Sequence, residues 1–331
     1  MRNDYKIPVV LTYIRDFILY KNSTFVFMKT STLRSDLLLL LSAIIWGLAF
    51  VAQRIGMDYV GPFTFTGVRF LLGGLSLIPI LYFFPHTSPY TKTKPLSLFW
   101  QKWGGLLAGL FLFSGISLQQ IGLQYTTAGK TGFLTGLYVV LVPIFGLALH
   151  HKTGLGTWIG VGLAVWGMYF LSITGNFQIL QGDLLIIIST FFWAFHVLII
   201  GWLSPYNHPI KLSIQQFLTA GVISLVIAFV IENVELSTIL QAGIPILYGG
   251  LFSVGIAFTL QVVVQKTAHP AHAAIIMSLE TVFAAFGGWL LLNEHLSARA
   301  LLGCLLMLCG MIFAQLNDWL LNKFRVKAKR I

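Results

Sequence analysis

The sequence predicts an all-α integral membrane protein with ten transmembrane helices in two inverted five-helix repeats. Its 331 residues are 57% hydrophobic and only 9% charged, whereas soluble domains use about 25% charged residues. A second observation is an internal repeat, because the segment SDLLLLLSAIIWGLAF at 35–50 returns as GDLLIIISTFFWAFHV at 182–197. An odd number of spans in each copy would insert the second copy upside down, which is the plan of many secondary transporters.

Apolar stretches define the expected spans, since a membrane helix needs about 20 mostly apolar residues. Ten such stretches run approximately over 35–57, 62–84, 104–123, 131–149, 155–173, 183–203, 212–231, 244–264, 272–292 and 298–316. We expect a first repeat at 35–173 and a second at 182–318, with a cytoplasmic N-terminal extension at 1–34 and a basic tail at 319–331. Met28 is an alternative start of the natural chain.

The two copies match along most of their length. Asp36, Ser42, Trp46 and Arg69 align with residues 147 positions later, namely Asp183, Ser189, Trp193 and Gln216. After a longer loop in the first copy the offset falls to 141, which aligns Gln120 with Gln261. Five helices per copy is the simplest unit that fits these matches.

The net charge of +11 is explained by topology. With the amino terminus inside, seventeen Lys and Arg residues fall on the inner side and three on the outer side, Arg54, Lys130 and Arg299. The positive-inside rule therefore predicts cytoplasmic termini in a bacterial inner membrane. We expect contact with anionic lipids, no nucleic-acid binding, and a monomer.

Cysteine and histidine patterns argue against a metal or cofactor. Cys304 and Cys309 lie five apart in the tenth span, which is neither a zinc spacing nor a disulfide framework. A histidine-dependent membrane enzyme is the rival class, because six of the eight histidines map to the inner side. Only the pairs His150–His151 and His269–His272 cluster, so the sequence predicts no metal, no cofactor and no enzyme.

Four segments resemble the EamA-type, ten-helix branch of the bacterial drug/metabolite transporter superfamily over about residues 35–316. They are the Trp46-Gly47 pair, Arg69, GFLTGLYVVLVP at 132–143 and SLETVFAAFGGWLLLNEHLS at 278–297. The resemblance implies export of amino acids, amines, drugs or other small metabolites from a central cavity between the halves. Two departures are Thr281, where many relatives have proline, and His150-His151-Lys152, where the matching loop of the second half has Glu294.

Two tryptophans are candidates for the walls of such a cavity. Trp46 and Trp193 lie about ten residues into their spans, near the midplane by helix rise. Gln53 shares the helix face of Trp46, and His196 that of Trp193. Core or lipid packing is the alternative for the tryptophans.

Polar side chains at depth supply the other candidates. Gln120 and Gln261 belong to matched amide stripes that should face the interior, as substrate contacts or as interhelical hydrogen bonds. Tyr138 presents its hydroxyl to the cavity or packs in the core. Arg69 is expected to snorkel to the outer surface or to form a structural pair.

Glu280 is the carboxylate well inside a span, and such groups are functional by default because they are costly in hydrocarbon. We expect it to couple transport to protons or to recognise a cationic substrate, with His196 as the other candidate partner. A tie between helices is the structural alternative. The sequence thus predicts a transporter of a small molecule, with a non-transporting membrane subunit as the alternative.

Overall fold

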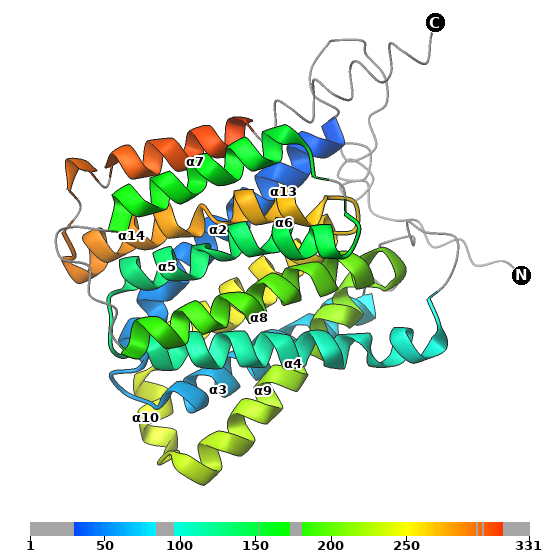
Figure 1. The fold of residues 1–331 in the computed structure, drawn as a ribbon. Helices are drawn as coiled ribbons and strands as arrows, with labels where there is room; N and C mark the ends of the chain where they lie inside the picture. The colour runs from blue at the N-terminus through cyan, green and yellow to red at the C-terminus, as the bar shows by residue number, and fades with distance from the viewer. Residues whose placement is uncertain are drawn as a thin grey trace, which may run out of the picture.

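The computed structural model describes residues 30–83, 96–151, 153–172, 181–295, 297–299 and 301–313 (Figure 1). Within these residues, eight helices are long and apolar enough to span a membrane, and two shorter apolar helices cover Leu155–Phe170 and Leu301–Phe313. They coincide with the ten predicted spans, which confirms the all-α membrane fold. Most of the predicted N-terminal extension, the basic tail, Lys92, Lys94, Lys152 and the loop at 174–180 lie outside the described residues.

The first half contains α2 (Thr30–Gly56), α3 (Pro62–Phe83), α4 (Leu98–Leu123), α5 (Ala128–Gly136), α6 (Tyr138–Ala148) and α7 (Leu155–Ser172). The second half contains α8 (Gln181–Leu203), η1 (Ser204–Tyr206), α9 (Pro209–Ile231), α10 (Leu236–Gln241), α11 (Gly243–Leu247), η2 (Tyr248–Phe258), α12 (Thr259–Val264), α13 (Pro270–Met277), α14 (Glu280–Leu292) and the helix at Leu301–Phe313. Proline begins α3, α9 and α13, where its missing N–H is no loss and its fixed φ suits a helix start.

Equivalent helices of the two halves cross in antiparallel directions, as an inverted repeat requires. A methyl group on Gly167 in α7 would lie 2.6 Å from the carbonyl oxygen of Gly303, and one on Gly310 would lie 2.7 Å from that of Gly160. The sequence IGVGLAVWGMYF at 159–170 matches LGCLLMLCGMIF at 302–313, which makes Gly160 and Gly167 the repeat equivalents of Gly303 and Gly310. The residue numbers rise along one helix as they fall along the other, and glycine at these positions permits the close approach.

The halves interlock rather than lying side by side. From the first half, α4 packs against α8 and α9; from the second, η2 packs against α2 and α3 in the same way. The fourth span of each half packs against the first span of the other, so α5 and α6 contact α8 while α13 and α14 contact α2. Figure 1 shows α4 and α8 running beside each other along the bundle. The core therefore lies between the halves.

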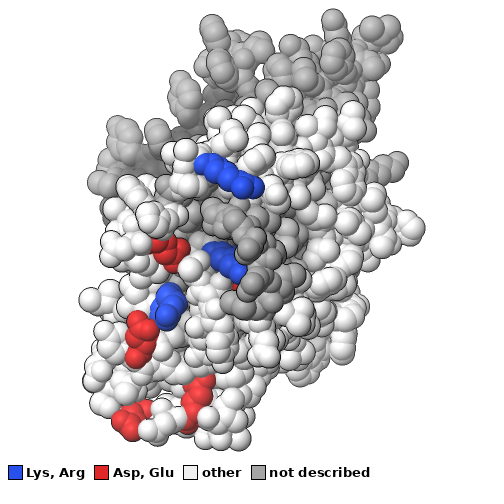
Figure 2. Space-filling model, turned by 60° about the vertical axis from the view of Figure 1, so that its left-hand side comes forward, with Lys and Arg blue, Asp and Glu red and all other residues white. Residues whose placement is uncertain are grey.

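The outward faces of the helices carry large apolar side chains, among them Leu41, Trp166, Phe229 and Leu290. Such a surface suits hydrocarbon and not water. Figure 2 brings forward the end of the bundle at which α3, α5 and α8 begin, and it shows scattered charges of both signs among uncharged residues. We call this end the Asp183 end, and the opposite end, where α2 and α13 begin, the Asp36 end.

The fourth and ninth spans are interrupted at equivalent positions. In the fourth span the backbone N–H of Val140 bonds to the carbonyl of Leu137 at 3.1 Å, and in the ninth the N–H of Thr281 bonds to that of Ser278 at 3.1 Å. Each bond joins residues three positions apart, whereas the bonds of an α-helix join residues four apart, so the helix is tighter at these points. The second segments then begin at Tyr138 and Glu280. Interrupted helices near mid-membrane often form the substrate sites of transporters.

The eighth span differs from its equivalent, α4. Its central segment, η2, is a π-helix, whereas α4 is a continuous α-helix. π-helical segments are rare and are often found at functional sites. Two residues of η2, Ser253 and Phe258, line the cavity described below. The sequence pattern did not distinguish these two spans.

Candidate functional site

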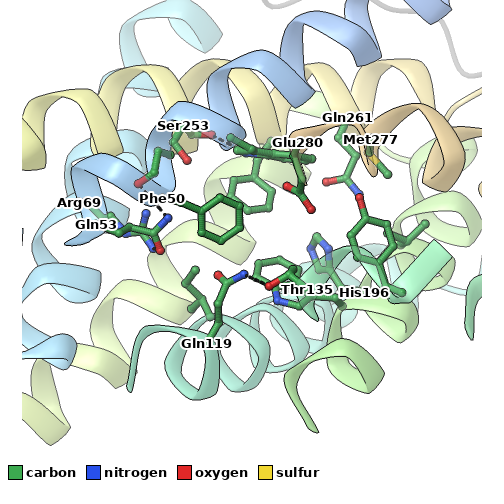
Figure 3. A pocket seen from close by; sticks show the side chains of 17 residues that line it. Phe50, Gln53, Arg69, Gln119, Thr135, His196, Ser253, Gln261, Met277 and Glu280 are labelled. Carbon is green, nitrogen blue, oxygen red and sulfur yellow. Dashed lines mark hydrogen bonds between the residues drawn. The ribbon is translucent and has the colours of Figure 1, made fainter. Parts of the chain in front are cut away.

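A cavity lies in the core between the halves (Figure 3). Seven of the predicted site residues line it: Trp46, Gln53, Tyr138, Trp193, His196, Gln261 and Glu280. They come from α2, α6, α8, α12 and α14, so both halves contribute. The cavity is therefore a shared site of the two repeats.

Three aromatic rings form its apolar wall. The ring of Phe258 lies 4.6 Å from that of Trp46 and 6.0 Å from that of Trp193, centroid to centroid, and is stacked on the latter. The two tryptophans thus meet through a third ring, which sequence reasoning missed because a phenylalanine in an apolar span gives no signal. Such a wall suits contact with a flat or apolar group of a ligand.

In the amide stripe of α4, Gln120 faces the interior and makes an interhelical hydrogen bond, which was the alternative to a substrate contact. Gln120 is fully buried and does not line the cavity; its Oε1 instead accepts from Nη2 of Arg69 at 3.5 Å. The neighbouring Gln119 lines the cavity, and its Nε2 donates to Oγ1 of Thr135, a second lining residue, at 2.8 Å. Adjacent residues differ by 100° around a helix, so the sequence alone could not decide whether Gln119 or Gln120 lines the cavity.

Arg69 also lines the cavity, with only 1% of its surface exposed. Its Nη2 donates to Oε1 of Gln53 at 3.2 Å. Its guanidinium carbon lies 5.2 Å and 5.3 Å from the ring centres of Phe65 and Phe70. Of the two alternatives expected for Arg69, these contacts fit the structural pair and not snorkelling to the outer surface, because they hold the side chain in the interior.

Glu280 is 5% exposed and interacts directly with the hydroxyl of Tyr138, which can donate to the carboxylate. His196, the partner suggested from sequence, is engaged elsewhere, with its Nε2 2.8 Å from Oε1 of Gln216. Glu280 and Tyr138 each begin the second segment of an interrupted span. The equivalent interruptions therefore bring these two groups together.

The two departures noted in the sequence both have structural roles. Oγ1 of Thr281 donates to the carbonyl of Gly132 at 2.9 Å and ties α14 to α5. The carboxylate of Glu294 accepts the N–H groups of Ala128 at 3.0 Å and Gly129 at 3.2 Å, which caps the start of α5. In the matching place at the Asp36 end, the ring of His151 lies 5.7 Å from that of His269, the residue before α13.

The described residues contain no group of three His, Cys, Asp or Glu side chains placed to hold a metal ion. The cavity is instead an apolar chamber with one guanidinium, one carboxyl group, one imidazole and several amides. Such a chamber can bind an organic molecule and orient its polar groups.

Comparison with known proteins identifies the family. A model of the EamA-like transporter family matches residues 33–173 and 180–315. The chain belongs to this family. A transporter from Archaeoglobus fulgidus, itself uncharacterized, is 32% identical over 86% of this chain and 87% of its own length. The uncharacterized inner membrane transporter YedA of Escherichia coli K12 is 27% identical, over 84% of this chain and 89% of its own.

A crystal structure of a protein with 17% sequence identity superposes with a TM-score of 0.67, over 87% of this chain and 98% of that one. At this identity the likeness shows the fold alone. Family membership and the apolar helices together make this EamA-family chain a multi-pass membrane transporter with a small-molecule substrate, and not an enzyme.

Proposed function

We propose that this transporter exports a small organic metabolite by alternating access, in which the two halves rock around the central cavity. The observation that carries the proposal is the position of the cavity: both repeats line it, and both interrupted spans begin their second segments at it. A site between inverted repeats can face either side of the membrane as the halves tilt.

Ion pairs at opposite ends of the bundle support this mechanism. At the Asp183 end, Oδ2 of Asp183 in α8 lies 2.6 Å from Nζ of Lys130 in α5. At the Asp36 end, Oδ1 of Asp36 in α2 lies 2.9 Å from Nε2 of His272 in α13. Each pair joins one half to the other, so opening either end requires one pair to separate while the opposite one can persist.

The orientation belongs to the same proposal. The lysine and arginine bias favours a bacterial cytoplasmic membrane with both termini inside, so that the Asp36 end faces the cytoplasm. Reporter fusions after Leu149 should be cytoplasmic, and those after Ile231 should be outside. The reverse pattern would overturn this orientation.

Transport by the purified protein is the test of the function. Export predicts that cells overexpressing the protein release more of a particular metabolite, and cells lacking it release less. Liposomes containing the purified protein should then move that metabolite. If they move nothing without a second protein, the chain is a non-transporting subunit and the proposal fails. In active protein, Trp46→Ala and Trp193→Ala should weaken substrate recognition more than expression.

Glu280 is the proposed coupling residue, taking up a proton or receiving a cationic group of the substrate. Its burial at an interrupted helix and its contact with the Tyr138 hydroxyl support this role. We expect Glu280→Gln to keep the folded protein but to lose the effect of an imposed pH gradient on transport in liposomes. Glu235→Gln, at an exposed glutamate, is the matched control. Undiminished, pH-coupled transport by Glu280→Gln would contradict the coupling role.

A further inference from the structure

The cavity contains the positively charged guanidinium of Arg69, which no carboxylate pairs with in the part of the chain that the structure describes. Arg69 is buried, and the ion pairs found among the described residues include no carboxylate within 4 Å of its guanidinium. Its hydrogen-bond partners are the amide oxygens of Gln53 and Gln120. Amide oxygens solvate a positive charge without cancelling it, and an unbalanced charge inside a membrane protein is costly.

The guanidinium also retains donor capacity. Nε of Arg69 is buried and has no hydrogen-bond partner among the described residues, whereas the bonds to Gln53 and Gln120 both use Nη2. A guanidinium presents its N–H groups as a rigid fork that fits the two oxygens of a carboxylate. The rings of Phe65 and Phe70 pack against it and hold its plane in place. The group is thus positioned and only partly satisfied.

The pseudo-symmetric position of the other half holds no cation. The repeat equivalent of Arg69 is Gln216, which is fully buried and bonds to Nε2 of His196. The same helix position therefore accepts a neutral amide in the other half. What differs is that Arg69 lines the cavity, whereas Gln216 is not among its lining residues.

We propose that Arg69 and the adjacent Gln53 form an anion subsite that binds a carboxylate group of the transported molecule. In Figure 3, Arg69 and Gln53 lie on one side of the chamber, away from Glu280 and Gln261. The aromatic wall supplies the surface for an apolar body. The ligand class is a small carboxylate with an apolar or aromatic part, and the assignment rests on the proposed transport function.

The test compares two probes that share one apolar body: 3-phenylpropionate and its methyl ester. Binding to the purified full-length protein is followed by tryptophan fluorescence, since Trp46 and Trp193 line the cavity. We expect 3-phenylpropionate to bind more tightly than its ester, and Arg69→Gln to weaken it about ten-fold or more while leaving the ester unchanged. Arg69→Lys should retain part of the preference. Equal binding of acid and ester by the wild-type protein would overturn the subsite.

A second variant keeps the inference testable if Arg69→Gln does not fold. Gln53→Glu places a carboxylate beside the guanidinium, so it should raise the melting temperature of the protein and abolish the preference for 3-phenylpropionate over its ester. A Gln53→Glu protein that is more stable but keeps that preference would show that Arg69 has only a structural role. Because these assays measure binding, the subsite survives if the protein binds the acid through Arg69 but transports nothing, and in that outcome only the transport proposal fails.

Discussion

An aspartate, a serine and a tryptophan occur at matched positions of α2 and α8, yet these side chains have different partners in the two helices. In α2, the hydroxyl of Ser42 lies 3.1 Å from the carbonyl of Leu38 in its own helix and also 3.1 Å from that of Ala257 in η2. Nε1 of Trp46 donates to the carbonyl of Ser253, also in η2, at 3.3 Å. In α8, the hydroxyl of Ser189 bonds within its own helix, to the carbonyl of Ile186 at 2.6 Å. Nε1 of Trp193 is buried without a hydrogen-bond partner among the described residues.

The difference comes from the helix opposite each motif. α2 packs against the π-helical η2, whereas α8 packs against the regular α4. Both acceptors of the α2 side chains, the carbonyls of Ser253 and Ala257, belong to η2. The motif of α2 is therefore hydrogen-bonded to the helix opposite it, whereas no such bond joins Ser189 or Trp193 to α4 among the described residues.

The aspartates of the two motifs also have different partners. Asp183 is paired with a lysine and Asp36 with a histidine, although both pairs link the first span of one half to the fourth span of the other. The Asp183 end is therefore closed by a lysine–aspartate ion pair with an N–O distance of 2.6 Å, and the Asp36 end by a histidine–aspartate contact of 2.9 Å.

The largest expected effect comes from breaking the pair at the Asp183 end. Lys130→Met leaves the carboxylate of Asp183, which is 0% exposed, without its lysine, and removing one partner of a buried ion pair costs about 3–5 kcal/mol. His272→Gln at the Asp36 end should cost about 1 kcal/mol, because an amide still donates to Asp36. Melting temperatures of the purified variants in detergent measure both. Equal losses would mean that the two ends are energetically alike.

A smaller effect is expected for the two tryptophans. Both variants lose part of a buried ring, but Trp46→Phe also removes the bond to the Ser253 carbonyl, whereas Nε1 of Trp193 has no partner among the described residues. Trp46→Phe should therefore cost about 1 kcal/mol more stability than Trp193→Phe. Thermal unfolding of the pair under identical conditions is the measurement, and a larger loss for Trp193→Phe would contradict the anchoring by η2.

The smallest effect concerns the charge environment of the Asp36 end. Burial, and then the charges of Lys266 and Lys211, lower the pKa of His208, which lies between two spans. A lowered pKa means that the unfolded chain binds a proton more readily, so this group favours unfolding as the pH falls through about 6.5. Lys266→Gln should raise the pKa of His208, as followed by NMR titration of labelled histidine. An unchanged value would mean that Lys266 does not act on the ring.

Several features of the site followed from the sequence. Periodicity and depth found Trp46, Trp193 and Glu280, because aromatic and acidic residues at mid-span are conspicuous in an apolar helix. Periodicity could not predict that Gln119 and not Gln120 lines the cavity, because the rotation of α4 is fixed by its packing against other helices. The sequence also left open whether Arg69 snorkels or forms a structural pair, because the direction of its side chain depends on Phe65, Phe70 and Gln53.

By itself, the sequence determined the membrane environment, the ten spans and their division into two matched halves, because hydrophobic length and repetition are properties of the chain alone. Only the tertiary structure decided which polar groups meet. Glu280 contacts Tyr138 instead of His196, and Arg69 lacks a nearby carboxylate in the described part of the chain. Such pairings depend on the π-helix, the interrupted spans and the rotation of each helix, which arise from close packing between segments more than a hundred residues apart.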